Sequence, residues 1–234
     1  MSFLSTVSGD VLLWRGNPNC AAAQKHVREW LRTSSPNYPT VWAPSNIRLV
    51  GNIGESVAFC CSRLAWDPLP RCFSANLGKP LSNMSRSGID LLWIGFGQSP
   101  DDDFVIHQEV KTTFANNLSY AASLLNDYEK SFGRDQNLTL NTHLQGVKVD
   151  LEFTHKQPQL SARVNALMSD SAKRATRLSI VPTLVHDAAT NDDPVAKLSG
   201  IEAQLKVLGW SQIETWSIAF TGISTHFKAI AEDK

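Results

Sequence analysis

The chain has 234 residues, 42% of them hydrophobic, with 22 basic and 22 acidic side chains. This size and apolar content suffice for a packed core and exclude an intrinsically disordered chain. The balanced charge excludes a globally basic nucleic-acid binder, so any polyanion-binding surface must be local. The four cysteines lack C-x-x-C spacing, and the sequence shows no secretory signal and no apolar run near 18 residues. We therefore expect a cytoplasmic protein with reduced thiols and no membrane contact.

The first 45 residues are predicted to be an accessory N-terminal segment, followed by one main domain over residues 46–234. Within the segment, Val11–Trp14 is apolar enough for a short strand. Asn17-Pro18 is a typical helix start, and the helix is expected to reach about Thr33. A Pro- and Ser-rich linker separates this helix from the main domain.

The main domain is predicted to begin with a helix over Ile47–Ala65, because apolar residues recur there at helical spacing. Glu55 is an acidic residue within this apolar helix. Pro68 and Pro70 end the helical region, and Arg71–Leu77 is expected to form the first strand of the core.

Two apolar, β-rich runs follow, Ile89–Phe96 and Phe104–Thr112, joined by a loop rich in Gly, Ser, Pro and Asp. This pattern predicts a hairpin. Asp90 stands at the start of the first run, so pairing places it opposite the end of the second run, beside Glu109.

Residues two apart in a strand share a face, so Glu109 and Lys111 are expected to point together, with His107 and Val105 beneath them. A carboxylate pair in a half-buried sheet is unfavourable unless something neutralises it. Mg²⁺ does so with one or two carboxylates, water and substrate phosphate as ligands. A lysine beside the ion can orient or deprotonate the attacking water and stabilise developing charge. The other interpretation is an exposed hairpin with a Glu109–Lys111 salt bridge and a capping Asp90.

Asp90, a strand, a loop and then Glu109-Val110-Lys111 resemble the motif of the PD-(D/E)xK nuclease superfamily, with Ile89 at the position of the family's proline. The resemblance implies an α/β, restriction-endonuclease-like fold, in which helices flank a mixed central sheet. It also implies Mg²⁺, for which Mn²⁺ can substitute, held by Asp90 and Glu109, with Lys111 serving the water. Glu55 matches in order a helical glutamate that supplies a further metal ligand or supports the site; the alternative is a surface glutamate.

The function implied by the resemblance is hydrolysis of DNA to a 5′-phosphate and a 3′-hydroxyl. The hairpin and the later VPTLVHD stretch also resemble, more weakly, bacterial anti-phage effector nucleases of the Hachiman type, which work beside a helicase. This implies a helicase or sensor subunit as a protein partner. The alternative function is a catalytically silent nuclease-like subunit for docking or nucleic-acid binding.

After Thr113, spaced apolar residues predict a helix that ends near Gly133, with Asn117 in its first turns as either a phosphate contact or a cap. Val147–Phe153 alternates strictly between apolar and polar residues and predicts a half-exposed antiparallel strand. Its outward residues Asp150 and Glu152 are a rival carboxylate pair, but no lysine is placed as Lys111 is, so we interpret them as solvated.

Gln159–Arg177 is predicted as one long helix. Four basic residues gather along its flank and are candidates for tracking a phosphate backbone: Arg163, Lys173, Arg174 and Arg177. The alternative is an ordinary solvated helix face. Four further elements are expected: a buried strand over 178–185, a helix over 195–208 capped by NDDP, a strand over 213–220 and a terminal helix over 224–232.

Overall fold

The computed structural model describes residues 3–5, 11–15, 43–66, 71–73, 89–132, 138–169 and 177–232. Its strands are β1 (Phe3–Ser5), β2 (Val11–Arg15), β3 (Arg71–Cys72), β4 (Leu91–Gly95), β5 (Phe104–Thr112), β6 (Leu178–Asp187) and β7 (Thr215–Phe220). Its helices are α2 (Ile47–Trp66), α3 (Ser123–Phe132), α4 (Leu138–Val149), α5 (Pro158–Ser169), α7 (Pro194–Val207) and α8 (Ile223–Glu232). No helix among the described residues is long and apolar enough to cross a membrane.

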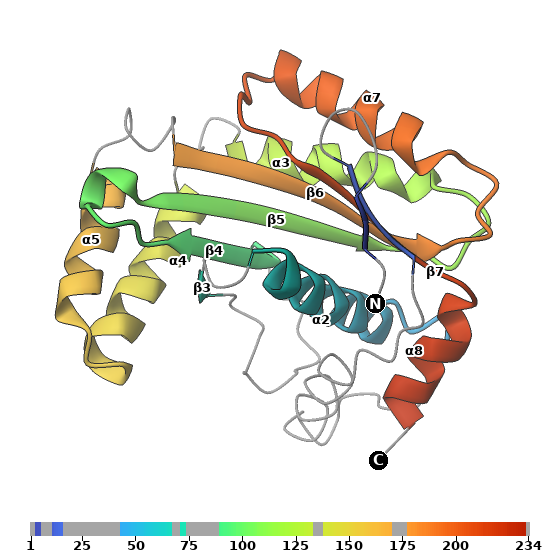
Figure 1. The fold of residues 1–234 in the computed structure, drawn as a ribbon, viewed down its shortest axis with the longest axis horizontal. Helices are drawn as coiled ribbons and strands as arrows, with labels where there is room; N and C mark the ends of the chain where they lie inside the picture. Colours follow the sequence, from blue (N-terminus) through green and yellow to red (C-terminus); the bar gives the residue numbers. More distant parts are fainter. Residues whose placement is uncertain are drawn as a thin grey trace.

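The strands form one mixed sheet in the order β1-β2-β7-β6-β5-β4-β3. Neighbours from β2 to β5 run parallel, whereas β4 is antiparallel to β5, β3 to β4 and β1 to β2. Helices flank the sheet (Figure 1). The predicted α/β class with a mixed central sheet is therefore confirmed. The first 45 residues contribute β1 and β2 to this same sheet.

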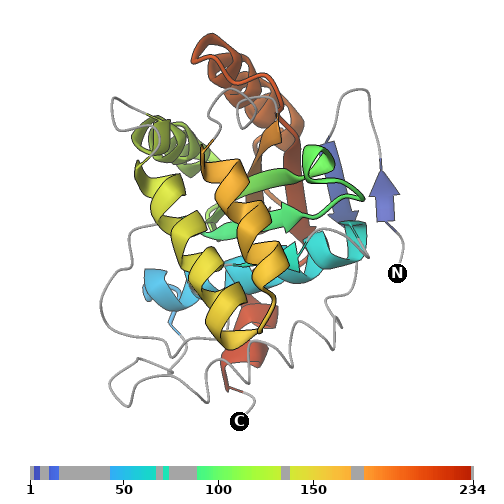
Figure 2. The same cartoon turned by 90° about the vertical axis from the view of Figure 1, so that its left-hand side faces the viewer.

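Two buried apolar clusters cover the two faces of the sheet. On one face, α2 and α8 pack through residues such as Leu49, Ile53 and Phe227 against Trp93 of β4 and Trp216 of β7. On the other face, α3, α4, α5 and α7 pack against alternate residues of β4, β5 and β6. Figure 2 shows α3 and α7 on the opposite side of the sheet from α2 and α8. Each central strand is thus buried on both sides, as expected of strands in a parallel arrangement.

Gln108 holds β5 in register. Its Oε1 accepts hydrogen bonds from Ser62 Oγ and Trp93 Nε1, each 3.0 Å away, and its Nε2 donates to Thr183 Oγ1 at 2.9 Å. These partners lie on α2, β4 and β6. A slip of one residue would move every β5 side chain to the other face and break all three bonds. Gln108 therefore determines which β5 residues face α3.

Most of the predicted elements are confirmed: the hairpin of β4 and β5, helix α2, strands β6 and β7, and helices α7 and α8. The Asp193 side chain caps α7, and Pro194 is its first residue. Gly209, just after α7, has a φ of 96°, a conformation that favours glycine. The helix predicted over residues 17–33 lies outside the described residues.

The strand predicted over Val147–Phe153 is wrong. Helix α4 reaches Val149 and continues as a π-helical turn over Asp150–Thr154. The buried residues Leu140, Leu144, Val147 and Leu151 recur at helical spacing and face one cluster. A short alternating stretch is compatible with the period of a strand and with that of a helix. The longer apolar stripe, which continues at helical spacing, favours the helix. The helix predicted over 159–177 is observed as α5 (Pro158–Ser169), and residues 170–176 lie outside the described part of the chain.

Candidate active site

Asp90 and Glu109 lie side by side at the start of β4 and near the end of β5, as the hairpin predicted. Leu91 pairs with Gln108, which puts the preceding Asp90 next to Glu109. Asp90 Oδ2 accepts a hydrogen bond of 2.9 Å from the Val110 amide, and each of the two carboxyl groups affects the pKa of the other. The two acids are therefore close neighbours at this end of the hairpin.

Burial strongly perturbs the pKa values of both acids. Glu109 is only 4% exposed, and burial is the main reason why its pKa rises to about 8. Burial, followed by the charge of Glu109, raises the pKa of Asp90 well above its ordinary value. Perturbation of this kind is concentrated at functional sites. The burial of Glu109 contradicts the alternative of an exposed hairpin, in which Glu109 would form a salt bridge with Lys111.

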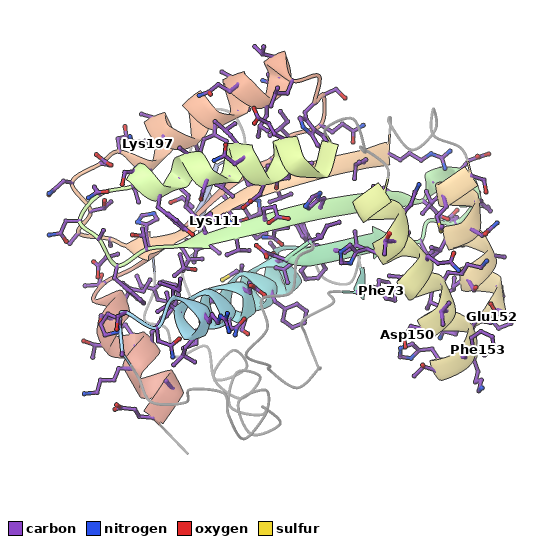
Figure 3. The ribbon with its side chains drawn as sticks, turned by 180° about the vertical axis from the view of Figure 1, so that it is seen from behind. Phe73, Lys111, Asp150, Glu152, Phe153 and Lys197 are labelled. Carbon is purple, nitrogen blue, oxygen red and sulfur yellow. The ribbon has the colours of Figure 1, made fainter. Side chains whose placement is uncertain are left out.

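Lys111 lies two residues beyond Glu109 on the same face of β5 and forms an ion pair with Asp127 of α3. Burial by itself lowers the pKa of Lys111. The negative charges of Asp90, Asp127 and Glu109 outweigh burial and raise that pKa above the usual lysine range. Lys111 is therefore an ammonium group beside the acid pair. Figure 3 shows Lys111 on the side of β5 that α3 covers.

His107 and Tyr128 support Glu109 from within the core. His107 Nε2 lies 2.6 Å from Glu109 Oε1, and burial lowers the pKa of His107 to about 3, so the ring is neutral. The Tyr128 hydroxyl accepts from the Glu109 amide at 3.2 Å and donates to the His107 carbonyl at 3.3 Å. His107 Nδ1 is buried and has no hydrogen-bond partner among the described residues. These contacts orient Glu109 without adding a positive charge.

Glu55 reaches the site from the other layer. Its helix, α2, packs on the face of the sheet opposite α3. A Cβ on the neighbouring Gly54 would lie 1.8 Å from Thr112 Oγ1, so glycine there allows α2 to approach the end of β5 closely. The charge of Glu55 contributes to the raised pKa of Glu109, after burial and the effects of Lys111, Asp90 and Asp127. Glu55 thus acts on Glu109 through its charge, from a partly buried position.

Sequence reasoning missed Asp127 altogether and gave His107 no role. Asp127 precedes Tyr128, one of the spaced apolar residues that predict the helix ending near Gly133. That neighbour indicates only that Asp127 flanks the buried face of α3. The pairing with Lys111 depends on how α3 lies across β5, which no local pattern specifies.

Arg163, one of the basic residues predicted to track a phosphate backbone, binds the loop between β4 and β5 in the structure. Arg163 donates to the carboxylate of Asp103 and, at 2.8 and 2.9 Å, to the carbonyls of Gly97 and Ser99; its guanidinium also lies 5.5 Å from the centre of the Phe96 ring. Hydrogen bonding to the buried carboxylate of Asp103 raises the pKa of Arg163.

Arg177 holds the same β4–β5 loop. It donates to the Pro100 carbonyl at 2.9 Å and to the Asp101 carboxylate at 3.2 Å. In the structure, Arg163 and Arg177 fasten this loop and each forms an ion pair with an aspartate. Their contact with a phosphate backbone stays a prediction. Lys173 and Arg174 lie outside the described residues.

Asn117, whose predicted role was either a phosphate contact or a cap, forms a local turn in the structure. Its Oδ1 accepts from the Ser119 amide at 3.1 Å and from the Ser119 hydroxyl at 2.6 Å. This closes a turn ahead of α3. The side-chain oxygen is therefore already engaged within the chain.

Within the described residues, no group of three or more His, Cys, Asp or Glu side chains is arranged to enclose a metal ion. Mg²⁺ does not need such a cage, since it binds through one or two carboxylates and retains water. Asp90 and Glu109 fit this requirement, because two adjacent acids that hold protons against their ordinary pKa gain most from a divalent cation.

The rival acids Asp150 and Glu152 do not fit the requirements of a Mg²⁺ site beside Lys111. Figure 3 shows them at the far end of α4, away from Lys111. Asp150 lies 3.2 Å from His155, and Glu152 is exposed and accepts from Ser161. Their interpretation as solvated acids agrees with this position.

No protein-family model matches the chain, and no curated protein matches it.

Proposed function

We propose that this chain is a Mg²⁺-dependent nuclease with a restriction-endonuclease-like fold that hydrolyses phosphodiester bonds in DNA. One observation carries the proposal: Asp90 and Glu109 meet at the end of the β4–β5 hairpin with perturbed pKa values, and the Lys111 ammonium stands on the same face. Helix α2 with Glu55, the hairpin and α3 also follow one another in the order that the PD-(D/E)xK resemblance implies.

The site residues suit this chemistry. Asp90 and Glu109 would hold the ion, which when bound lowers the pKa of the attacking water and neutralises phosphate charge. In-line attack of water on phosphorus breaks the bond to the 3′ oxygen and leaves a 5′-phosphate and a 3′-hydroxyl. Lys111 stabilises the negative charge that grows on the phosphate oxygens in the transition state. His107 and Tyr128 keep Glu109 in one orientation.

The biological setting proposed is an anti-phage defence complex, in which a helicase or sensor subunit supplies DNA to the nuclease. This part rests on the weaker sequence resemblance, which is an analogy and not a property of the site. The formal net charge of the chain is zero, which fits a nuclease that relies on a partner to recruit DNA.

The test is cleavage of supercoiled plasmid and of end-labelled single- and double-stranded DNA. Mg²⁺ and Mn²⁺ should support cleavage, Ca²⁺ should not, and a chelator should abolish it, because Ca²⁺ prefers more ligands and looser geometry. Asp90→Asn, Glu109→Gln and Lys111→Met should each remove activity. Asp150→Asn and Glu152→Gln make the same carboxylate-to-amide change far from the site and should cleave normally.

Cleavage that survives the chelator, or that survives Asp90→Asn, would refute the nuclease proposal. The alternative, a catalytically silent subunit of the same fold, predicts DNA binding that Asp90→Asn and Glu109→Gln leave unchanged, with no metal-dependent cleavage by the wild type. The single set of assays separates the two functions.

A further inference from the structure

We infer that Asp127 is a positioning residue, which holds the Lys111 ammonium away from the Asp90–Glu109 pair and so keeps both acids available for a divalent ion. The inference rests on the proposed function. The direct observation is the ion pair between Lys111 on β5 and Asp127 on α3, whose side chains are 17% and 28% exposed.

The backbone around Asp127 is anchored to the strand that carries the site. The adjacent residue Tyr128 is fully buried, and its hydroxyl bonds to the backbone of both His107 and Glu109. The His107 and Tyr128 rings are also in contact, with centres 5.1 Å apart. Helix α3 therefore presents the Asp127 carboxylate at a defined place beside Lys111.

Lysine has a flexible four-carbon stem and three rotatable donors, so its position depends on its partners. The charges of Asp90, Glu109 and Asp127 all act on Lys111. Without Asp127, the remaining attraction draws the ammonium onto Asp90 and Glu109. A lysine bound to these two acids would compete directly with a metal ion for them.

The charges at the site support this division of roles. Asp90, Glu109 and Asp127 contribute three negative charges and Lys111 one positive charge, and Glu55, whose charge acts on Glu109, adds a fourth negative charge. When all are ionised, the negative charges outnumber the positive one, and this excess favours binding of a cation. Asp127 neutralises Lys111, and Asp90 and Glu109 are left to neutralise the ion.

Asp127→Asn is the decisive variant, with Glu129→Gln as its matched control. Glu129 is exposed on the same helix, so its substitution removes an equal charge without touching Lys111. Calorimetric titration with Mn²⁺ or Mg²⁺ measures metal affinity independently of cleavage. Asp127→Asn should weaken metal binding about 10- to 100-fold and lower kcat more than it changes KM, as substitutions of residues that orient a metal site commonly do. Asp127→Glu should recover most of the loss, whereas Glu129→Gln should bind as the wild type does.

A double-mutant cycle with Lys111→Met separates positioning from a general field effect. If Asp127 acts through Lys111, adding Asp127→Asn to Lys111→Met causes no further loss of metal affinity. An equal loss in both backgrounds, or none in either, would overturn the inference while wild-type cleavage still supports the nuclease. A wild type that neither binds metal nor cleaves DNA would instead overturn the proposed function itself.

Discussion

The two faces of β5 bury polar side chains for different purposes. Toward α2, Gln108 is fully buried, neutral and hydrogen-bonded at both ends of its amide. Toward α3, His107 and Glu109 are also buried, yet both have strongly perturbed pKa values and His107 Nδ1 lacks a partner among the described residues. These residues alternate along one strand and share the same backbone environment.

The difference separates polar burial that stabilises the fold from polar burial that costs stability. Gln108 satisfies donors and acceptors from α2, β4 and β6 with neutral partners, so its network stabilises the fold at little electrostatic cost. The α3 face keeps acids together that repel each other, which costs stability when no cation is present. A chain retains such an arrangement where the charges are needed for binding or chemistry. Substitutions on the two faces should therefore have opposite consequences.

Glu109→Gln should have the largest effect, and on activity alone. DNA cleavage should fall by on the order of 10³-fold or more, because the site loses a charged group at which transition-state charge is balanced. The melting temperature of the metal-free protein should hold or rise, since the repulsion with Asp90 is relieved. Quantitative cleavage assays and thermal denaturation without metal test both parts. A marked loss of stability would mean that Glu109 is a structural residue like Gln108.

Gln108→Leu should have the opposite effect, a loss of stability with little change in activity. It leaves Ser62 Oγ and Trp93 Nε1 without their acceptor, and buried unsatisfied groups cost about 1–3 kcal/mol each. We expect the free energy of unfolding to fall by about 2–5 kcal/mol. Chemical denaturation gives the stability change, and cleavage measured per folded molecule should stay within a few-fold of the wild type. Unchanged stability would remove the structural role assigned to this face.

The stability of the metal-free protein should fall as pH rises from about 5 to about 8. The pKa of Glu109 is about 8 in the folded chain against an ordinary 4.5, so between these values the folded state binds more protons than the unfolded state. Raising the pH through that window therefore favours unfolding. A difference of one in pKa corresponds to about 1.4 kcal/mol, and we expect a total loss on the order of a few kcal/mol.

Two comparisons test the contribution of Glu109 to this pH dependence. Glu109→Gln should reduce the dependence, because one of the two acids with a raised pKa is gone while Asp90 remains. Saturating Mg²⁺ should flatten it if the ion binds the ionised acids, since binding then replaces the protons. Denaturation curves at several pH values measure the slope, and a slope that is unchanged in Glu109→Gln would assign it to another group.

Arg163→Gln should have the smallest effect on function. Charge-assisted hydrogen bonds contribute about 1.5–3 kcal/mol, so we expect a loss of about 1–3 kcal/mol in stability from unfastening the β4–β5 loop. DNA affinity should keep its salt dependence, because a lost phosphate contact would lower the slope of log K against log salt by about 0.9. Binding titrations at several salt concentrations decide this. A lower slope of log K against log salt in Arg163→Gln would mean that Arg163 contacts DNA.

Local sequence patterns were sufficient for the parts of this protein that depend on neighbours along the chain. Strand alternation placed Glu109 and Lys111 on one face, and the hairpin brought Asp90 beside Glu109. The NDDP cap located the start of α7. These features follow from backbone geometry, which the local residues control.

Tertiary structure alone decided the contacts between distant segments. Asp127 reaches Lys111 only because α3 crosses β5, and Arg163 reaches Asp103 across 60 positions in the chain. The alternation in Val147–Phe153 fitted two periods, and packing against the helical cluster selected the helix. Burial, which raises the pKa of Glu109, is likewise a property of the assembled layers and not of the sequence around it. The sequence determined which acidic and basic side chains share a strand face, and the packing of helices on the sheet determined their partners and charges, because those depend on contacts that no local pattern encodes.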